Sequence, residues 1–273
     1  MKTLKQEHGA GSLTISRQTW SDGLYTKGDD EVVMETAAAL TYNGISHVVM
    51  MITPTHLEDF ALGFSLSEGI IDTTSQLLER EIIERDKGIE IKIEVAASCF
   101  HQLKQRRRNL EGRTGCGLCG AESLEQAIRP APTVSNQFKL SASALDKAVA
   151  ALRNAQPLAQ ATGASHAAAW CDQQGEILLV REDVGRHNAV DKIIGALSSV
   201  ESGAPMSSKL TRNKGFIVVT SRASYEIVMK VAMANIGVLV ALSAPTSMAI
   251  EYAKKSGVSL IGFAEKGRHS HYN

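Results

Sequence analysis

The sequence has little cysteine and no excess of charge of either sign. Only four of its 273 residues are cysteine. A chain of this length buries enough apolar surface to fold without cross-links, so four cysteines do not indicate a disulfide framework. Lysine plus arginine and aspartate plus glutamate both number 29, which excludes a general electrostatic attraction to nucleic acid or to an anionic membrane. Any bound anion must therefore be held by a local cluster of basic groups.

Long hydrophobic runs are also absent. Apolar stretches such as "GVLVALSA" are far shorter than the length that crosses a bilayer. The first residues, "MKTLKQEHGAGSLTISRQ", carry lysines but lack the apolar core of a secretion signal. We expect a soluble cytoplasmic protein with neither a membrane nor a nucleic acid as partner.

The first part of the chain has the pattern of strands around one helix. In "GIEIKIEVAA", residues 88–97, apolar and charged side chains alternate, which predicts a half-buried strand. "TPTHLEDFALGFSLSEGI" has apolar residues at near-helical spacing after Pro54 and predicts a helix that stops near Gly69. The segment "RPAPTVSNQFKLSAS" has two prolines and no periodicity, so it is the candidate linker. We predict an N-terminal α+β domain over 1–135, including the linker, and a second domain over 136–273.

The second domain alternates apolar strands with helical periods. "SHAAAWCDQQGEILLV" predicts two strands around a glycine turn, and "HNAVDKIIGAL" predicts a helix with one apolar face. Three further strands, "GFIVVT", "VLVALS" and "VSLIGF", alternate with two helices, one ending at Gly237 and the other at Gly257. This order predicts an α/β domain with helices layered on a sheet.

Ligands in such sheets bind beyond the carboxyl ends of the strands. Three loops fall there, "REDVGRHN", "TSRASY" and "FAEKGRH", and all three contain arginine. Guanidinium groups and backbone N–H groups at helix starts are suited to phosphate. The loops therefore predict an anion site, although the first could instead hold a helix cap by Asp183 with Arg186 in an ion pair.

A separate feature, "RTGCGLCG", places the thiols of Cys116 and Cys119 three positions apart among glycines. The cationic stretch "KQRRRNLEGR" precedes it. Glycine packs poorly, so an incidental pair of core cysteines is a weak explanation. Thiol exchange is an alternative, because C-x-x-C spacing and nearby arginines favour the thiolate.

Two zinc alternatives stay open. A structural zinc site needs four ligands, and the other candidates are Cys99 and His101. A zinc-dependent deaminase would use an H-x-E motif, for which His56 and Glu58 are candidates, although glycine and not proline precedes Cys116. The sequence alone thus allows a thiol-transfer protein, a zinc-dependent deaminase-like hydrolase or a zinc-stapled binding protein.

Several motifs together point to one family. "TPTHLEDFALGFSLSEGI", "RTGCGLCG", "EDVGRHNAVDK", "TSRASYEIVMKVA" and "LIGFAEKGR" occur in this order over nearly the whole chain. In residues and order they closely resemble the formate dehydrogenase accessory sulfurtransferase (FdhD) family. The resemblance implies a sulfurtransferase that carries sulfane sulfur as a cysteine persulfide from a cysteine desulfurase. The acceptor would be the molybdenum (or tungsten) bis-pterin guanine dinucleotide cofactor required for formate dehydrogenase activity.

The resemblance also implies a fold and an assembly. The C-terminal domain would resemble the cytidine deaminase fold, as a three-layer α/β domain without a tightly bound metal. The protein would form a symmetric homodimer, with the α/β domains as the expected contact.

Residue roles follow from the motif positions. Cys116 would carry the persulfide, with Cys119 as its partner in the motif. Thiolate chemistry would be supported by a group of arginines, Arg106, Arg107, Arg108 and Arg113. The cofactor-binding stretch would be Phe263, Ala264, Glu265, Lys266, Gly267 and Arg268. Further matched motif positions, whose roles we infer from chemistry alone, are Arg186, His187, Asp191, Lys192, Arg222 and Ser224.

Overall fold

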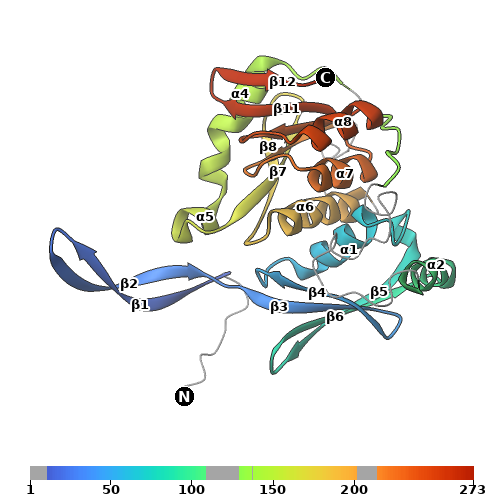
Figure 1. Ribbon diagram of the computed structural model, residues 1–273, viewed down its shortest axis with the longest axis horizontal. Coiled ribbons are helices and arrows are strands. Elements are labelled where there is room, and N and C mark those ends of the chain that lie inside the picture. The colour runs from blue at the N-terminus through green and yellow to red at the C-terminus, as the bar shows by residue number, and fades with distance from the viewer. Residues whose placement is uncertain (1–10, 109–128, 137, 202–213) are drawn as a thin grey trace.

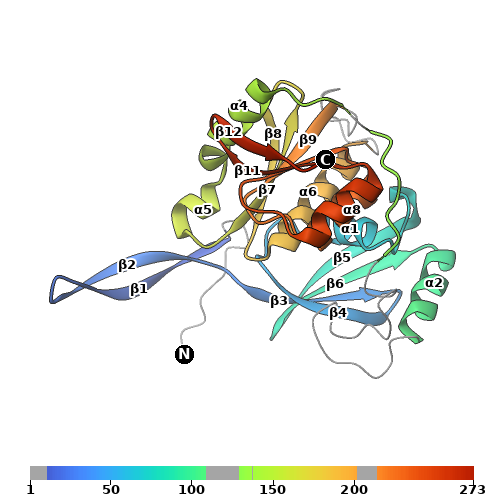
Figure 2. The ribbon, with the colours of Figure 1, turned by 45° about the horizontal axis from the view of Figure 1, so that its top comes forward.

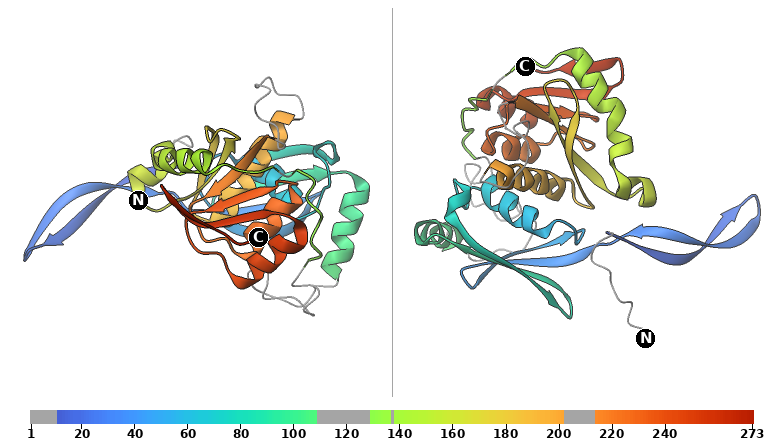
Figure 3. Two further views of the ribbon diagram at one scale, coloured as in Figure 1. Left: turned by 90° about the horizontal axis from the view of Figure 1, so that it is seen from above. Right: turned by 180° about the vertical axis from the view of Figure 1, so that it is seen from behind.

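A long β-hairpin at the N-terminal end projects from the body of the protein (Figures 1 and 3). The computed structural model describes residues 11–108, 129–136, 138–201 and 214–273. The hairpin consists of β1 (Ser12–Ser21) and β2 (Leu24–Val33), paired antiparallel over their whole length. Asp22 and Gly23 join them, and both have positive φ, as two-residue hairpin turns require.

A four-stranded sheet follows, and one of its faces is covered by a helix. The strands are β3 (Thr36–Tyr42), β4 (Ile45–Ile52), β5 (Leu77–Arg85) and β6 (Gly88–Val95), in the order β4-β3-β6-β5. The expected alternation in β6 is confirmed, because all four of its inward apolar side chains are buried. The expected helix is also confirmed as α1 (Leu57–Ser67), and α2 (Ala97–Arg108) follows β6.

The second part of the chain forms a six-stranded sheet of order β12-β11-β10-β9-β7-β8. Its strands are β7 (His166–Asp172), β8 (Ile177–Asp183), β9 (Gly215–Val219), β10 (Val238–Ala241), β11 (Ser259–Glu265) and β12 (Arg268–His271). Its helices are α4 (Ala142–Leu152), α5 (Pro157–Thr162), α6 (Arg186–Glu201), α7 (Tyr225–Met233) and α8 (Ser247–Ser256). Short 3-10 turns occur at Thr74–Gln76 and Arg153–Ala155.

Helices lie on both faces of this sheet. One apolar cluster joins α4 to the side chains of one face, and a second joins α6, α7 and α8 to the other. The expected order of strands and helices in an α/β domain is therefore confirmed.

The second apolar cluster continues without interruption into the four-stranded sheet. Helix α1 packs directly on α6, so that the two sheets enclose both helices (Figure 2). The two helices approach closely because a glycine of each helix lies against the backbone of the other. A Cβ on Gly63 of α1 would lie 1.7 Å from the carbonyl oxygen of Asp191 in α6, and a Cβ on Gly195 of α6 would lie 1.8 Å from the carbonyl oxygen of Asp59 in α1. The two predicted domains thus share one core, and the boundary at 135/136 stays a prediction.

The proline-containing segment after residue 128 runs over α7 and α8 and is held there. Tyr252 donates a hydrogen bond to the carbonyl of Pro130, and the Val134 N–H donates to the carbonyl of Ser256. Val134 is buried. The candidate linker is therefore packed on the body. In the part of the chain that the structure describes, no helix has the length and apolarity to cross a membrane.

Candidate functional site at the carboxyl edge of the six-stranded sheet

The three arginine-containing loops meet at one edge of the six-stranded sheet. Strands β9, β10 and β11 are parallel, and β8 has the same direction because β7 is antiparallel to both β8 and β9. The carboxyl ends of all four strands therefore lie at this edge. The segment after β10 lies between two of these loops and is bonded to both, from the Thr246 N–H to the Ala223 carbonyl (3.0 Å) and from the Phe263 N–H to the Ser243 carbonyl (3.2 Å).

Basic side chains gather where β7 begins and α6 starts. His166 is the first residue of β7, and Arg186 and His187 open α6. Burial lowers the pKa of His166, and the neighbouring charges of Arg186 and His187 lower it further. His187 Nε2 lies 2.7 Å from a carboxylate oxygen of Glu226. The buried Nε of Arg186 has no hydrogen-bond partner among the described residues, so it is a donor that an anionic ligand could use.

Asp183 lies three residues before α6, and its ion pair is with Lys192. Its carboxylate accepts hydrogen bonds from the Gly185 N–H (2.8 Å) and the Asn188 side chain (2.9 Å), and it lies 2.6 Å from the ammonium of Lys192. Asp183 and Lys192 are both fully buried. The carboxylate of Asp183 therefore forms its ion pair with the buried Lys192, and the suggested helix cap stays a prediction.

The loop after β9 carries Arg222 and Ser224. Arg222 is exposed, and Ser224 is the N-cap of α7, where its hydroxyl accepts a hydrogen bond from the Ile227 N–H. The serine hydroxyl thus has a structural task in the cap. Arg222 is the group of this loop that is placed to meet a ligand.

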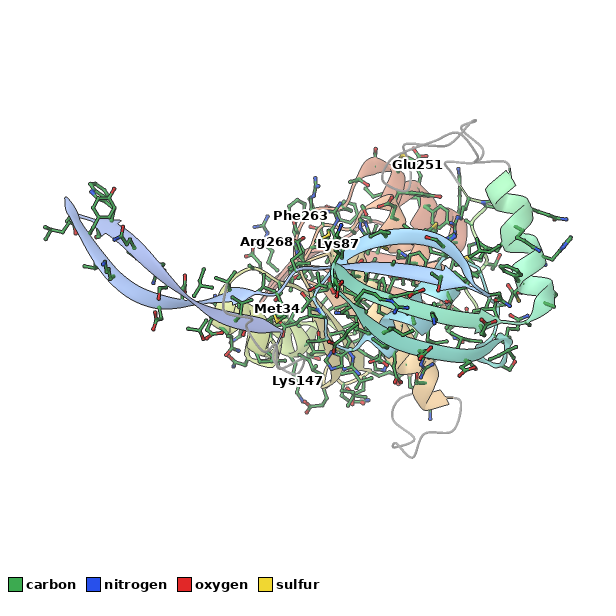
Figure 4. All side chains as sticks on the ribbon, turned by 90° about the horizontal axis from the view of Figure 1, so that it is seen from below. Met34, Lys87, Lys147, Glu251, Phe263 and Arg268 are labelled. Atoms are coloured by element: carbon green, nitrogen blue, oxygen red, sulfur yellow. The ribbon has the colours of Figure 1, made fainter. Side chains whose placement is uncertain are left out.

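The C-terminal stretch forms the end of β11 and its turn into β12, where Figure 4 labels Phe263 and Arg268. Phe263 is 42% exposed and has a positive φ of 49°, a strained conformation for an aromatic residue, at a break in the β11–β12 register. Ala264 is buried, so only its backbone is available. The exposed residues are Glu265, Lys266, Gly267 and Arg268, and the Gly267 N–H donates to Asp146 (3.0 Å).

Cys116, Cys119 and Arg113 lie outside the described residues, as do the side chains of Arg106, Arg107 and Arg108. The structure does describe where the chain resumes after the thiols. The Arg129 N–H donates to the hydroxyl of Tyr225 (2.7 Å), the first residue of α7. Arg129 is ten positions after Cys119, and an extended chain spans at most about 33–36 Å over ten positions. The thiol segment therefore rejoins the body next to the loop of Arg222 and Ser224.

The side chain of Arg129 continues into a buried charged network. Its guanidinium donates to the carboxylate (2.6 Å) and the carbonyl (2.9 Å) of Glu68, at the end of α1. Lys230 of α7 binds Glu68 (2.8 Å) and Asp191 of α6 (2.9 Å). Ser67 also donates to Asp191 (2.5 Å). We call Arg129, Glu68, Lys230 and Asp191 the clasp, because they join α1, α6, α7 and the chain that follows the thiols.

Opposite charges outweigh burial at Glu68 and Lys230 of the clasp, whereas burial raises the pKa of Asp191 despite the ammonium group of Lys230. Burial alone would raise the pKa of Glu68, but Lys230 and Arg129 hold it at about 2. Burial lowers the pKa of Lys230, but the carboxylates of Asp191 and Glu68 outweigh burial and raise that pKa above its ordinary value. Sequence reasoning missed the clasp. The sequence does contain a signal for it. Asp191 and Lys230 interrupt the apolar faces of the helices that became α6 and α7. Because a buried charge is costly without a partner, each of these residues implies an oppositely charged neighbour.

The remaining cysteines differ from an exposed reactive thiol. Cys99 and Cys171 are buried, and burial raises the pKa of the Cys171 thiol. Cys99 and His101 do not form a ligand pair, because they are two residues apart on α2 and His101 is exposed and bonded to Gln105. No group of three or more potential metal ligands occurs among the described residues.

The deaminase-like pair is placed at the start of α1. His56 is the N-cap residue, in a left-handed conformation, and burial lowers its pKa. The Glu58 carboxylate is exposed and lies 3.3 Å from a guanidinium nitrogen of Arg80. An ion-paired surface glutamate is typical of an ordinary helix start.

The fold and the site define an α/β protein in which Arg129, ten positions after Cys119 in the sequence, is bound at a cationic sheet edge. Residues 33–273 match the model of the FdhD/NarQ family, and the chain belongs to this family. It is 50% identical over 260 residues to a sulfur carrier protein FdhD of Cupriavidus necator, covering 95% of this chain and 87% of that protein. It is 46% identical over 264 residues to one of Xanthomonas euvesicatoria pv. vesicatoria, covering 97% and 86%.

A solved structure has a similar fold. The crystal structure described as a formate dehydrogenase accessory protein of Desulfotalea psychrophila matches with a TM-score of 0.70 at 22% identity, and the match covers 96% of each chain. The family expected from the sequence motifs is therefore confirmed.

Proposed function

We propose that this protein is a cytoplasmic sulfurtransferase that carries sulfur on Cys116 to a molybdenum (or tungsten) bis-pterin guanine dinucleotide cofactor. Its family and its relatives, named sulfur carrier proteins, support a sulfur-carrying role. The observation that supports the proposal is the hydrogen bond from the Arg129 N–H to Tyr225, because it holds the chain at the cationic sheet edge only ten positions after Cys119 in the sequence.

Sulfur loading is a thiolate exchange. The Cys116 thiolate attacks the outer sulfur of a persulfide on a cysteine desulfurase; the new S–S bond forms on Cys116, and the donor's S–S bond breaks. The donor cysteine leaves as a thiol with the proton of its former persulfide. Cys119 stands three residues away as the second thiol of the motif.

The sheet edge is suited to the phosphates and guanines of the acceptor. Arg222, Arg186 and Arg268 would contact phosphate through planar guanidinium groups, with Lys266 as a further charge. The turn at Gly267, with φ of 80°, lets the backbone come close to a ligand. Phe263, which is exposed and strained, would face the ligand, with His187 and Ser224 at the two helix starts. The cofactor, when bound, would supply the metal that accepts sulfur.

The three-layer arrangement around the six-stranded sheet supports a likeness to the cytidine deaminase fold, here proposed without a zinc ion of its own. A formate dehydrogenase, or the cofactor bound to it, would be the recipient.

Restoring formate dehydrogenase activity in cells that lack this protein tests the proposal. Wild type and Cys171→Ala should restore activity, because Cys171 is buried and takes no part. Cys116→Ala should restore none, at equal protein abundance. Restoration by Cys116→Ala would overturn the assignment of the carrier cysteine.

A further inference from the structure

Two histidines lie side by side on the last strand of the six-stranded sheet. His269 and His271 alternate with Arg268 and Ser270 along β12, so the two imidazole rings lie on one face of the strand and Arg268 lies on the other. The ring centroids are 5.1 Å apart, and the ring planes are inclined at 67° to each other. We call His269 and His271 the histidine pair.

The histidine pair lies at an edge of the sheet. β12 pairs antiparallel with β11 and is the terminal strand of the sheet order, so no strand of the described chain lies on its other side (Figure 1). His271 is exposed and His269 is half-buried. An ion can therefore reach the pair from solvent.

The separation of the rings fits two imidazoles that share one tetrahedral metal ion. A zinc–nitrogen bond is about 2.0–2.1 Å long, which puts the centre of each ligating ring about 3.2 Å from the ion. Two such rings at the tetrahedral angle have their centres about 5.2 Å apart. The observed 5.1 Å is close to this value. The backbone therefore already holds the two rings at the spacing that a shared ion requires.

The surroundings of the rings also favour metal binding. Burial lowers the pKa of His271, and the neighbouring charge of His269 lowers it further. Metal ligation requires a neutral imidazole, so protons compete less for this ring than for an isolated histidine. The buried Nδ1 of His269 has no hydrogen-bond partner among the described residues, and a metal ion is one of the partners that such an atom can take.

Two protein ligands leave coordination positions for water or for a ligand from solution. No group of three or more potential metal ligands occurs in the part of the chain that the structure describes, so no carboxylate or thiol of that part completes the set. A site with two protein ligands is weaker than a closed four-ligand zinc site, and mild chelation should therefore remove its ion.

We propose that His269 and His271 form a surface site for a divalent transition-metal ion that prefers imidazole nitrogen. Zn²⁺ is the ion whose tetrahedral geometry suits the separation of the rings. The site goes beyond the proposed sulfur transfer, because it assigns a ligand to two residues that have no role in that function.

Calorimetric titration of Zn²⁺ tests the site. The parent protein is the untagged full chain with Cys116→Ser and Cys119→Ser, so that these thiols do not compete for the ion. We expect one ion per chain. His269→Ala and His271→Ala should each weaken binding at least about tenfold, because even an outer partner of a metal ligand contributes that much. The matched control is His101→Ala, which removes an exposed histidine of α2 and should leave the affinity unchanged.

Two further measurements separate a metal site from an effect on folding. Without metal, the histidine variants should melt at the same temperature as the parent. Zn²⁺ should raise the melting temperature of the parent and of His101→Ala, but not that of a variant lacking both His269 and His271. In NMR spectra of the parent, Zn²⁺ should shift the ring proton signals of His269 and His271 and leave those of His101 in place.

Three results would each overturn the metal site. The first is a parent protein that binds no Zn²⁺ even at millimolar concentration. The second is an affinity that stays the same when both His269 and His271 are replaced. The third is a parent protein that binds the ion without any shift in the ring signals of the histidine pair.

Discussion

The guanidinium of Arg129 donates to both the carboxylate (2.6 Å) and the backbone carbonyl (2.9 Å) of Glu68. This pair joins the chain that follows the thiols to the end of α1. Through Lys230 it also reaches Asp191 of α6. Arg129, where the chain resumes after the thiols, is therefore held by a network of charges on α1, α6 and α7.

Removing the guanidinium should destabilise the protein measurably. Arg129→Ala deletes two charge-assisted hydrogen bonds, so we expect the free energy of unfolding to fall by about 1–3 kcal/mol in urea denaturation. The matched control is Arg85→Ala, which deletes an exposed 2.6 Å ion pair with Glu90. It should cost at most about 0.5–1 kcal/mol, because solvent screens that pair. Equal losses would show that the clasp contributes no more than a surface pair.

The stabilisation that Glu68 contributes to the clasp should be lost in acid. The pKa of Glu68 is lowered from 4.5 to about 2 in the folded protein, so its contribution is complete above the unfolded value. That contribution is lost as the pH falls from 4.5 towards about 2. The difference in unfolding free energy between wild type and Glu68→Gln should thus be constant near neutral pH and shrink below 4.5. A difference that grows in acid would contradict the assigned charge state.

The C-terminal turn should bind a guanine nucleotide without metal or pterin. GDP carries the guanine and phosphates of the proposed acceptor, and Arg268 is exposed at the turn. Arg268→Ala should weaken GDP binding about ten- to a hundredfold in calorimetric titration, since one charge-assisted contact is lost. Lys255→Ala, at the far end of α8, is the control and should bind as wild type. An unchanged affinity with a lower melting temperature would mean that Arg268 only secures the chain end.

Purified protein should hold far less than one zinc per chain. Two closely spaced thiols do not complete a tetrahedral site, and Cys99 and His101 lie on different faces of α2. Elemental analysis after mild chelation measures this directly. Stoichiometric, chelation-resistant zinc would favour the hydrolase or zinc-stapled alternative.

The spacing of apolar residues predicted the helices and strands, because the side chains that each element buries recur at a fixed spacing within a short stretch of sequence. The β6 alternation and the apolar face of α6 each required only a short window. The clasp depends on Glu68, Asp191 and Lys230 meeting across long stretches of chain, which no local pattern encodes. The strand-like character of the first part of the chain was predicted, but the pairing of β1 with β2 in a projecting hairpin was not, although Asp22-Gly23 is a recognised hairpin signal.

The most direct test of sulfur transfer is the mass of the intact protein after incubation with a cysteine desulfurase and cysteine. We predict a gain of one sulfur atom that a reductant removes, located on the peptide containing Cys116. The gain should be absent in Cys116→Ala and unchanged in Cys171→Ala, whose thiol is buried. A full gain of sulfur on Cys116→Ala, or none on wild type, would contradict the proposed role of Cys116 as the sulfur carrier.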